Sequence, residues 1–155
     1  MKNAIKAELL EQLKSSLIDA ELAAKNARLA SIDEQSVAET QYDTLAIEAS
    51  YLAEGQSRRV DELKLSIELI NKLIIDGGND IVGIASLVTL SKNENLLYFL
   101  APTAAGYRLN VEEKQVVVIT DKSPIGRALL GKGLGDEIHL VLGKNVIDDE
   151  ISAII

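Results

Sequence analysis

The sequence predicts an α+β protein in which an N-terminal antiparallel two-helix coiled coil precedes a small antiparallel β domain with one short helix. Apolar residues in the first half recur at steps of three and four, which is the period of packed helices. In the second half, short runs alternate apolar and polar residues, as strands do. A glycine-containing segment at 76–80 breaks both patterns. We therefore predict a helical domain at 1–76 and a globular domain at 77–155.

Two apolar seams define the predicted helices. The first consists of Leu10, Leu13, Leu17, Ala20, Ala24 and Ala27, and the second of Val60, Leu63, Ile67, Ile70 and Ile74, extended backward through Tyr42, Ala46, Ala49 and Ala53. Residues 31–36 carry turn and cap chemistry, and a connection this short folds the helices into an antiparallel hairpin. A first helix of about 27 residues gives an arm about 40 Å long. The tip of the arm is expected around residues 31–43.

The globular half is expected to contain several strands around one capped helix. The strands are predicted at 81–90, 95–101, 115–120, 137–142 and 146–155. The helix is predicted at 124–130. Ser123 can cap its free N–H groups, Pro124 suits the first helical position, and Gly131 can end the helix.

Composition and charge exclude several classes of function. Only 3% of the residues are aromatic and the net charge is -8, which together argue against direct nucleic-acid binding. No segment approaches the ~20 apolar residues that span a bilayer, and the charged N-terminal segment does not resemble a signal peptide. The chain has no cysteine, which excludes thiolate metal sites and fits a cytoplasmic protein. His139 is the only histidine, so we interpret it as a strand residue rather than a metal ligand.

Carboxylates gather near the predicted tip. Between Leu29 and Ser57 the chain has six acidic residues and neither Lys nor Arg: Asp33, Glu34, Glu39, Asp43, Glu48 and Glu54. Glu39 and Asp43 lie one helical turn apart, and oxygen ligands at that spacing suit a weakly held Mg²⁺. Acidic residues near a helix start also complement the helix dipole without any metal. The spacing alone favours this structural interpretation.

One string in the globular half is much more specific. It runs from Ser123 to Lys132 and is followed by Gly135, Asp136 and the strand predicted at 137–142. The string resembles the C-terminal domain of the bacterial Gre transcript-cleavage factors, whose signature is Ser-Pro-Ile-x-x-x-Leu-Ile-Gly-Lys before a Gly-Asp strand. The two-domain layout is also similar to that of these factors.

The resemblance implies a fold and a partner. Gre factors combine a coiled-coil arm with a globular domain similar to the FK506-binding proteins, and they bind core RNA polymerase at the rim of its secondary channel. It implies a transcription elongation factor that is not itself an enzyme, contacts the RNA 3′ end indirectly and holds no tightly bound cofactor. The implied partner-binding residues are Ser123, Pro124, Ile125 and Arg127. Ser123 and Pro124 also act as caps, whereas capping does not require Arg127.

The resemblance also assigns roles at the tip. Gre factors carry Gly-Asp-Leu-x-Glu-Asn there, and its two carboxylates help to hold the second catalytic Mg²⁺ of the polymerase. When Glu54 and Gly55 are aligned with the Glu-Gly pair of the family, Glu39 falls on the motif glutamate, whereas Ser36 falls on the aspartate. The expected ligands of this shared, transient Mg²⁺ are therefore Glu39, Asp33 and Asp43, the last two as replacements for the missing aspartate.

Three other functions stay open at this point. A Gre-like competitor would occupy the channel without promoting cleavage, which the serine at the aspartate position favours. A peptidyl-prolyl isomerase of the FK506-binding type would need an aromatic proline pocket, but the second half has only Tyr98, Phe99 and Tyr107. A structural coiled coil would self-associate through the arm, where alanines permit close helix packing.

Overall fold

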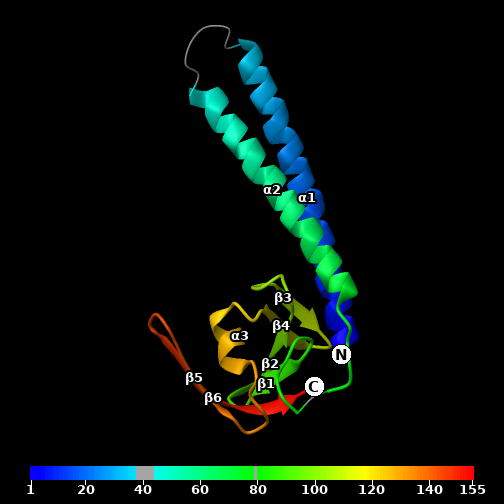
Figure 1. The fold of residues 1–155 in the computed structure, drawn as a ribbon, viewed down its shortest axis with the longest axis vertical. Coiled ribbons are helices and arrows are strands. Elements are labelled where there is room, and N and C mark those ends of the chain that lie inside the picture. Colours follow the sequence, from blue (N-terminus) through cyan, green and yellow to red (C-terminus); the bar gives the residue numbers. More distant parts are fainter. Residues whose placement is uncertain (38–43, 79) are drawn as a thin grey trace. The chain divides into compact units, whose positions relative to one another are not determined.

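The computed structural model describes residues 1–37, 44–78 and 80–155, and the chain divides into two compact units (Figure 1). One unit, called the arm from here on, consists of Glu11–Glu68. The other, the globular unit, combines Met1–Leu10 with Leu69–Ile155. Helices α1 (Lys2–Val37) and α2 (Thr44–Lys72) therefore each contribute residues to both units.

The two helices run antiparallel in the arm, as the sequence predicts. The hydroxyl oxygens of Ser31 and Ser50 lie 3.2 Å apart, and Lys64 Nζ lies 3.8 Å from Glu21 Oε1. Higher-numbered residues of α1 therefore lie beside lower-numbered residues of α2, as in an antiparallel pair. Among the arm residues whose burial is described, the buried ones are Leu13, Ala20, Ala24, Ala27, Ser31 and Leu63. Because alanine is small, this seam lets the helix backbones approach closely and keeps the arm narrow.

Helix α1 is longer than the sequence predicted. It continues through residues 31–36, where cap and turn chemistry predicted its end, and it stops at Val37. Because this segment contains neither Gly nor Pro, its serine and aspartate residues do not interrupt the helix. The predicted turn at 31–36 is therefore wrong. The 36 residues of α1 correspond to a length of about 54 Å.

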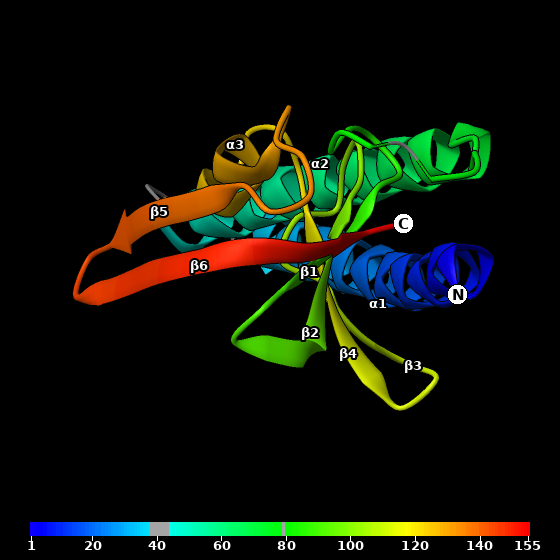
Figure 2. The same ribbon diagram turned by 90° about the horizontal axis from the view of Figure 1, so that it is seen from below.

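A six-stranded sheet forms most of the globular unit (Figure 2). The strands are β1 (Leu87–Leu90), β2 (Asn93–Leu100), β3 (Arg108–Val111), β4 (Lys114–Ile119), β5 (Glu137–Leu142) and β6 (Asn145–Ile154), and α3 (Pro124–Leu129) follows β4 in the chain. Their order in the sheet is β3-β4-β2-β1-β6-β5. Neighbouring strands pair antiparallel, except that β2 and β4 pair parallel. The α+β class is confirmed, and the expected antiparallel sheet is corrected to a mixed one.

Strand β3 is the strand that the sequence analysis missed. It has four residues and connects to β4 through Glu112 and Glu113, whose φ angles are 51° and 65°. Tight hairpin turns with two positive φ angles usually carry Asn or Gly. Two glutamates at these positions gave no turn signal, so the short strand before them was not recognised.

The main core of the globular unit is aliphatic. Its buried members are Val82, Val88, Leu90, Leu100, Ile119, Leu129, Ile138 and Ile151. Val82 lies in the segment before β1, and the others come from β1, β2, β4, β5, β6 and α3. The short helix therefore packs on the sheet through Leu129 and, partly, through Ile125. Within the described ranges, no helix is long and apolar enough to cross a membrane.

Two lysines of α1 bind carbonyl groups at the end of α2 and in the segment that follows it. Lys6 Nζ donates to the carbonyl oxygens of Asn71 at 3.0 Å and Leu73 at 2.7 Å, and Lys2 Nζ donates to that of Asp76 at 2.7 Å. The last carbonyl groups of a helix lack partners within the helix, and the negative end of its dipole attracts cations. These lysines therefore stabilise the C-terminal end of α2.

The Lys6→Met variant tests this stabilisation. Because it keeps most of the aliphatic chain but removes two hydrogen bonds, we expect the free energy of unfolding to fall by about 1 kcal/mol. Thermal unfolding followed by circular dichroism measures the change. The control is Lys14→Met, since Lys14 contacts only the exposed carboxylate of Glu11, at 3.1 Å. Equal destabilisation by both substitutions would contradict the stated role of Lys6.

Candidate partner-binding site

Ser123 begins α3 and ties it to the end of β4. Its Oγ accepts hydrogen bonds from the N–H groups of Gly126 and Thr120, both at 3.2 Å, and donates to the Thr120 carbonyl oxygen at 2.7 Å. Pro124 follows at the start of the helix, where the N–H group that it lacks would have no helical partner. The predicted cap is confirmed, and it also closes the turn between strand and helix.

Gly126 has a packing role that the sequence analysis missed. A Cβ atom on this residue would lie 1.9 Å from the Thr120 carbonyl oxygen, which is far closer than any nonbonded contact. Glycine is therefore required for α3 to approach the end of β4. The sequence did contain a signal for this role, because a glycine inside a helix lowers helix stability by about 1 kcal/mol relative to alanine. A glycine at such a position therefore indicates a packing requirement.

The four predicted partner-binding residues have different environments. Pro124 and Arg127 are exposed, whereas Ser123 is half-buried and Ile125 packs partly against the core. Arg127 Nε and Nη2 donate to the carbonyl oxygen of Lys122 at 3.2 and 2.8 Å. Arg127 therefore closes the loop before α3, a local role that capping rules did not predict. The exposed surface of α3 is formed mainly by Pro124 and Arg127.

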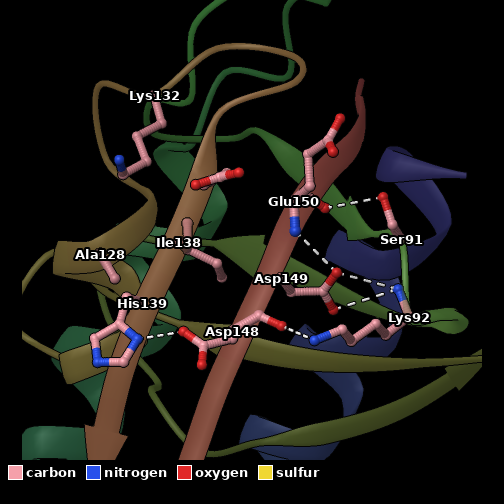
Figure 3. Close-up of a pocket in the computed structure, with 10 residues that line it drawn as sticks. Ser91, Lys92, Ala128, Lys132, Ile138, His139, Asp148, Asp149 and Glu150 are labelled. Carbon is pink, nitrogen blue, oxygen red and sulfur yellow. Dashed lines mark hydrogen bonds and ion pairs between the residues drawn. The ribbon is translucent and has the colours of Figure 1, made fainter.

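An open cavity of about 780 Å³ lies beside α3 (Figure 3). Its lining consists of Ser91, Lys92, Ala128, Lys132, Glu137, Ile138, His139, Asp148, Asp149 and Glu150. Ala128 comes from α3, and most of the other residues come from the β1–β2 turn and from strands β5 and β6. Four carboxylates against two lysines make the lining acidic, and Ala128 contributes apolar surface, whereas Ile138 is only 2% exposed and belongs to the core.

Hydrogen bonds join the β1–β2 turn to β6 at this cavity. The Lys92 N–H donates to the Asp149 carboxylate oxygens at 3.2 and 3.3 Å, and Lys92 Nζ donates to the Asp148 carbonyl oxygen. Ser91 Oγ donates to the Glu150 carbonyl oxygen at 3.3 Å (Figure 3). The position of the acidic strand relative to the turn is therefore fixed by several bonds.

Two cross-strand pairs set the charge on one face of the β5–β6 ribbon. His139 Nδ1 pairs with Asp148 Oδ1, and the next pair on that face places Glu137 opposite Glu150. Like charges directly opposite each other destabilise a strand pair, and a nearby cation would relieve this repulsion. The lining is therefore suited to a Lys or Arg side chain of a binding partner.

The sequence analysis missed this cavity and predicted only a strand position for His139. The usable signal was the run Asp148, Asp149 and Glu150 inside a strand, because carboxylates are depleted in strands. None of the described residues that line the cavity is Tyr, Phe or Trp, and Phe99 is fully buried. The cavity therefore lacks the aromatic lining expected of a prolyl isomerase.

Tyr98 lies next to this acidic region and packs partly against the core. Burial raises the pKa of the Tyr98 hydroxyl, and the negative charge of Asp149 raises it further, while Arg108 lowers it. A raised pKa keeps the phenol neutral to higher pH in the folded protein than in the unfolded chain. The associated stability is present below the ordinary tyrosine pKa and is lost as the pH rises through the folded value.

The structure does not describe the side chains of the predicted metal ligands at the tip. Glu39 and Asp43 lie outside the described residues, and Asp33 lies in α1 with a side chain that the structure does not describe. Within the ranges that are described, no group of three or more His, Cys, Asp or Glu side chains could hold a metal ion. The roles of Glu39, Asp33 and Asp43 stay predictions.

Comparison with known proteins finds similarity only to solved structures, because neither a family model nor a curated protein matches the chain. GreA factor homolog 1 (Gfh1) of Thermus thermophilus is 21% identical, with 94% of each chain covered and a TM-score of 0.39. Gfh1 of Thermus aquaticus is 23% identical over 93% of this chain and 92% of that chain, with a TM-score of 0.37. A GreA/GreB elongation factor from Nitrosomonas europaea is 18% identical over 81% of this chain and 92% of that chain, with a TM-score of 0.33. At these values the matches assign no role to any residue.

The Gly126→Ala variant tests the turn that positions α3. Because the new Cβ would overlap the Thr120 carbonyl, the helix must shift, and we expect a loss of about 2–3 kcal/mol in the free energy of unfolding. Chemical denaturation measures the change. The matched control is Gly55→Ala in α2, where a Cβ atom meets nothing within 4 Å and the substitution should stabilise the helix slightly. Equal effects of the two substitutions would contradict the role given to Gly126.

Proposed function

We propose that this protein is a bacterial transcription elongation factor of the GreA/GreB type, which binds core RNA polymerase at the rim of the secondary channel. The observation that carries the proposal is the string from Ser123 to Lys132, which follows the Gre signature in order and forms α3 and its two ends in this chain. A long antiparallel helical pair together with an α+β unit fits the same architecture. The protein would act in the cytoplasm as an accessory factor and not as an enzyme.

The docking surface would lie on the globular unit, around α3. Pro124 and Arg127 are exposed there, and Ala128 leads from the helix into the acidic cavity beside it. Apolar surface next to four carboxylates suits a partner element that carries both aliphatic and basic side chains. The partner would therefore place a Lys or Arg near Glu137 and Glu150.

The arm would enter the channel and bring its acidic tip toward the polymerase active site. Glu39 occupies the family glutamate position, and Asp33 or Asp43 would supply a second carboxylate to a Mg²⁺ that the polymerase shares. The metal would belong to the polymerase, and any contact with the RNA 3′ end would be indirect. The low aromatic content and the net charge of -8 are consistent with a protein that does not bind the RNA directly.

A second candidate function is a Gre-like competitor that occupies the channel without stimulating cleavage. The observation that favours it is Ser36, which stands where the family motif has an aspartate. Loss of one oxygen ligand weakens a metal that is already poorly held. The two candidates share the docking surface and differ only in what the tip does.

The Arg127→Glu variant tests the docking surface. Arg127 is the cation on the exposed face of α3 and would face an acidic group of the polymerase, so reversing its charge should lower the affinity for core RNA polymerase about tenfold, or about 1.4 kcal/mol. The effect on stability should stay near 0.5 kcal/mol, since the lost bonds to the Lys122 carbonyl are exposed. Fluorescence anisotropy of the labelled protein measures binding.

The matched control for this experiment is Arg108→Glu. Arg108 is an exposed arginine on β3, at the opposite edge of the sheet from β5, which α3 contacts. Unchanged affinity of Arg127→Glu, or an equal loss with both variants, would reject α3 as the docking surface. A collapse of thermal stability in Arg127→Glu would show that the arginine is mainly structural.

A second pair of variants separates the two candidate functions of the tip. If the protein stimulates transcript cleavage, Glu39→Ala should lower the cleavage rate at least about tenfold, equal to about 1.4 kcal/mol of activation free energy, with polymerase binding nearly unchanged. Ser36→Asp should create or raise cleavage by restoring the second carboxylate. Glu48→Ala, on α2, is the control and should have no effect. An inert Ser36→Asp variant that still binds would favour the competitor.

A further inference from the structure

The side of α1 that faces away from its buried seam carries a second apolar row. At 3.6 residues per turn, this row lies about 180° around the helix from Ala20, Ala24 and Ala27. We call it the outer seam, and it consists of Ser15, Ile18, Leu22, Lys25, Leu29 and Ile32. The steps alternate between three and four residues, which is the spacing of the a and d positions of a heptad repeat.

The outer seam has no partner in the described part of the chain. Ile18 is 66% exposed, Leu22 57%, Leu29 51% and Ile32 54%. The face of a surface helix opposite its buried stripe normally carries polar residues. Here four exposed aliphatic side chains extend along about 21 Å of helix, interrupted only by Lys25, and exposed apolar surface of this extent marks an interaction site.

We propose that the outer seam pairs with the outer seam of a second copy of this chain, as an antiparallel coiled coil. In an antiparallel pair, each a position packs beside a d position of the other helix. In the matching register, Ile18 packs beside Leu29 of the second copy, and Leu22 packs beside its Lys25. The aliphatic stem of Lys25 then covers Leu22 while its ammonium group reaches solvent. The pair is isologous, so each contact occurs twice.

The charges that flank the outer seam identify a second copy as the partner. Glu21 and Arg28 occupy equivalent flanking positions one heptad apart. In the antiparallel register, Glu21 of each copy faces Arg28 of the other, which gives two ion pairs of opposite charge. Glu21 also forms an ion pair with Lys64 Nζ of α2 at 3.8 Å, so pairing with Arg28 of the second copy would replace one exposed cation by another. Arg28, which lines a groove of the arm with Asp61 and Lys64, has no hydrogen bond or ion pair within the described residues and would gain a partner.

A parallel arrangement is less favourable. It would place Lys25 directly opposite Lys25 of the second copy inside the seam, because d positions face d positions in a parallel pair. It would also pair Glu21 with Asn26 rather than with a cation. The sequence of the outer seam is thus self-complementary in the antiparallel direction only.

Sedimentation of the full-length protein tests the proposal. We expect a monomer–dimer equilibrium at micromolar to millimolar concentrations, and Leu22→Asp should weaken it at least about tenfold. The matched control is Leu65→Asp on α2, since Leu65 is exposed to the same degree, 56% against 57%, but lies off the outer seam. A wild-type protein that stays monomeric, or equal effects of the two variants, would overturn the proposal.

Charge reversal tests the register and the identity of the partner. Glu21→Arg and Arg28→Glu should each weaken self-association, because each places like charges opposite each other twice. An equimolar mixture of the two variants should form a heterodimer, since both ion pairs are then restored, and the double variant should dimerise as the wild type does. Absence of heterodimer from the mixture, or single variants that dimerise normally, would contradict the antiparallel pairing.

Self-association through the outer seam does not rest on the proposed function, but a paired arm is too wide to enter the channel, so the dimer would have to dissociate before it binds polymerase. The two proposals can still fail separately. A protein that binds core RNA polymerase but stays monomeric would remove only the dimer. A dimer that the Leu22→Asp variant abolishes, in a protein that fails to bind polymerase, would remove only the proposed function.

Discussion

The hydroxyl group of Ser123 is the interaction on which the candidate site depends. It bonds to both backbone groups of Thr120 and to the Gly126 N–H, so the end of β4 and the first turn of α3 form one rigid corner. The missing Cβ of Gly126 allows the helix to lie directly against the Thr120 carbonyl group. Because the corner is rigid, Leu129 enters the core while Arg127 stays exposed. The candidate binding surface thus depends on how β4 ends.

Local chemistry explains what the sequence could predict. Ser123, Pro124 and Gly131 mark the ends of α3 within ten residues, and the strand that follows alternates clearly, so both elements were predicted almost to the residue. The acidic cavity was not predicted, because its walls come from the β1–β2 turn, β5 and β6, which meet only through long-range pairing. Sequence periodicity places each strand but does not show which strands become neighbours.

In the arm, too, the sequence pattern predicted some features of the helices and not others. Apolar spacing predicted two packed helices, and the short connection predicted that they run antiparallel. Rules for caps placed the end of α1 too early, because serine and aspartate residues lie inside the helix. The alanine seam makes the pair narrow, which suits a hairpin that enters a channel. The outer seam repeats the same spacing on the opposite side of α1, but its larger aliphatic side chains are exposed whereas the alanines are buried. One helix therefore carries an internal and an external apolar face.

The most direct test of the central claim is competition for core RNA polymerase. A labelled, well-characterised Gre factor is bound to the polymerase, and the unlabelled protein is titrated against it while displacement is followed by fluorescence anisotropy. If the globular unit docks at the rim of the secondary channel, the protein displaces the Gre factor completely, and the Arg127→Glu variant needs a higher concentration to do so. No displacement at large excess would contradict the account.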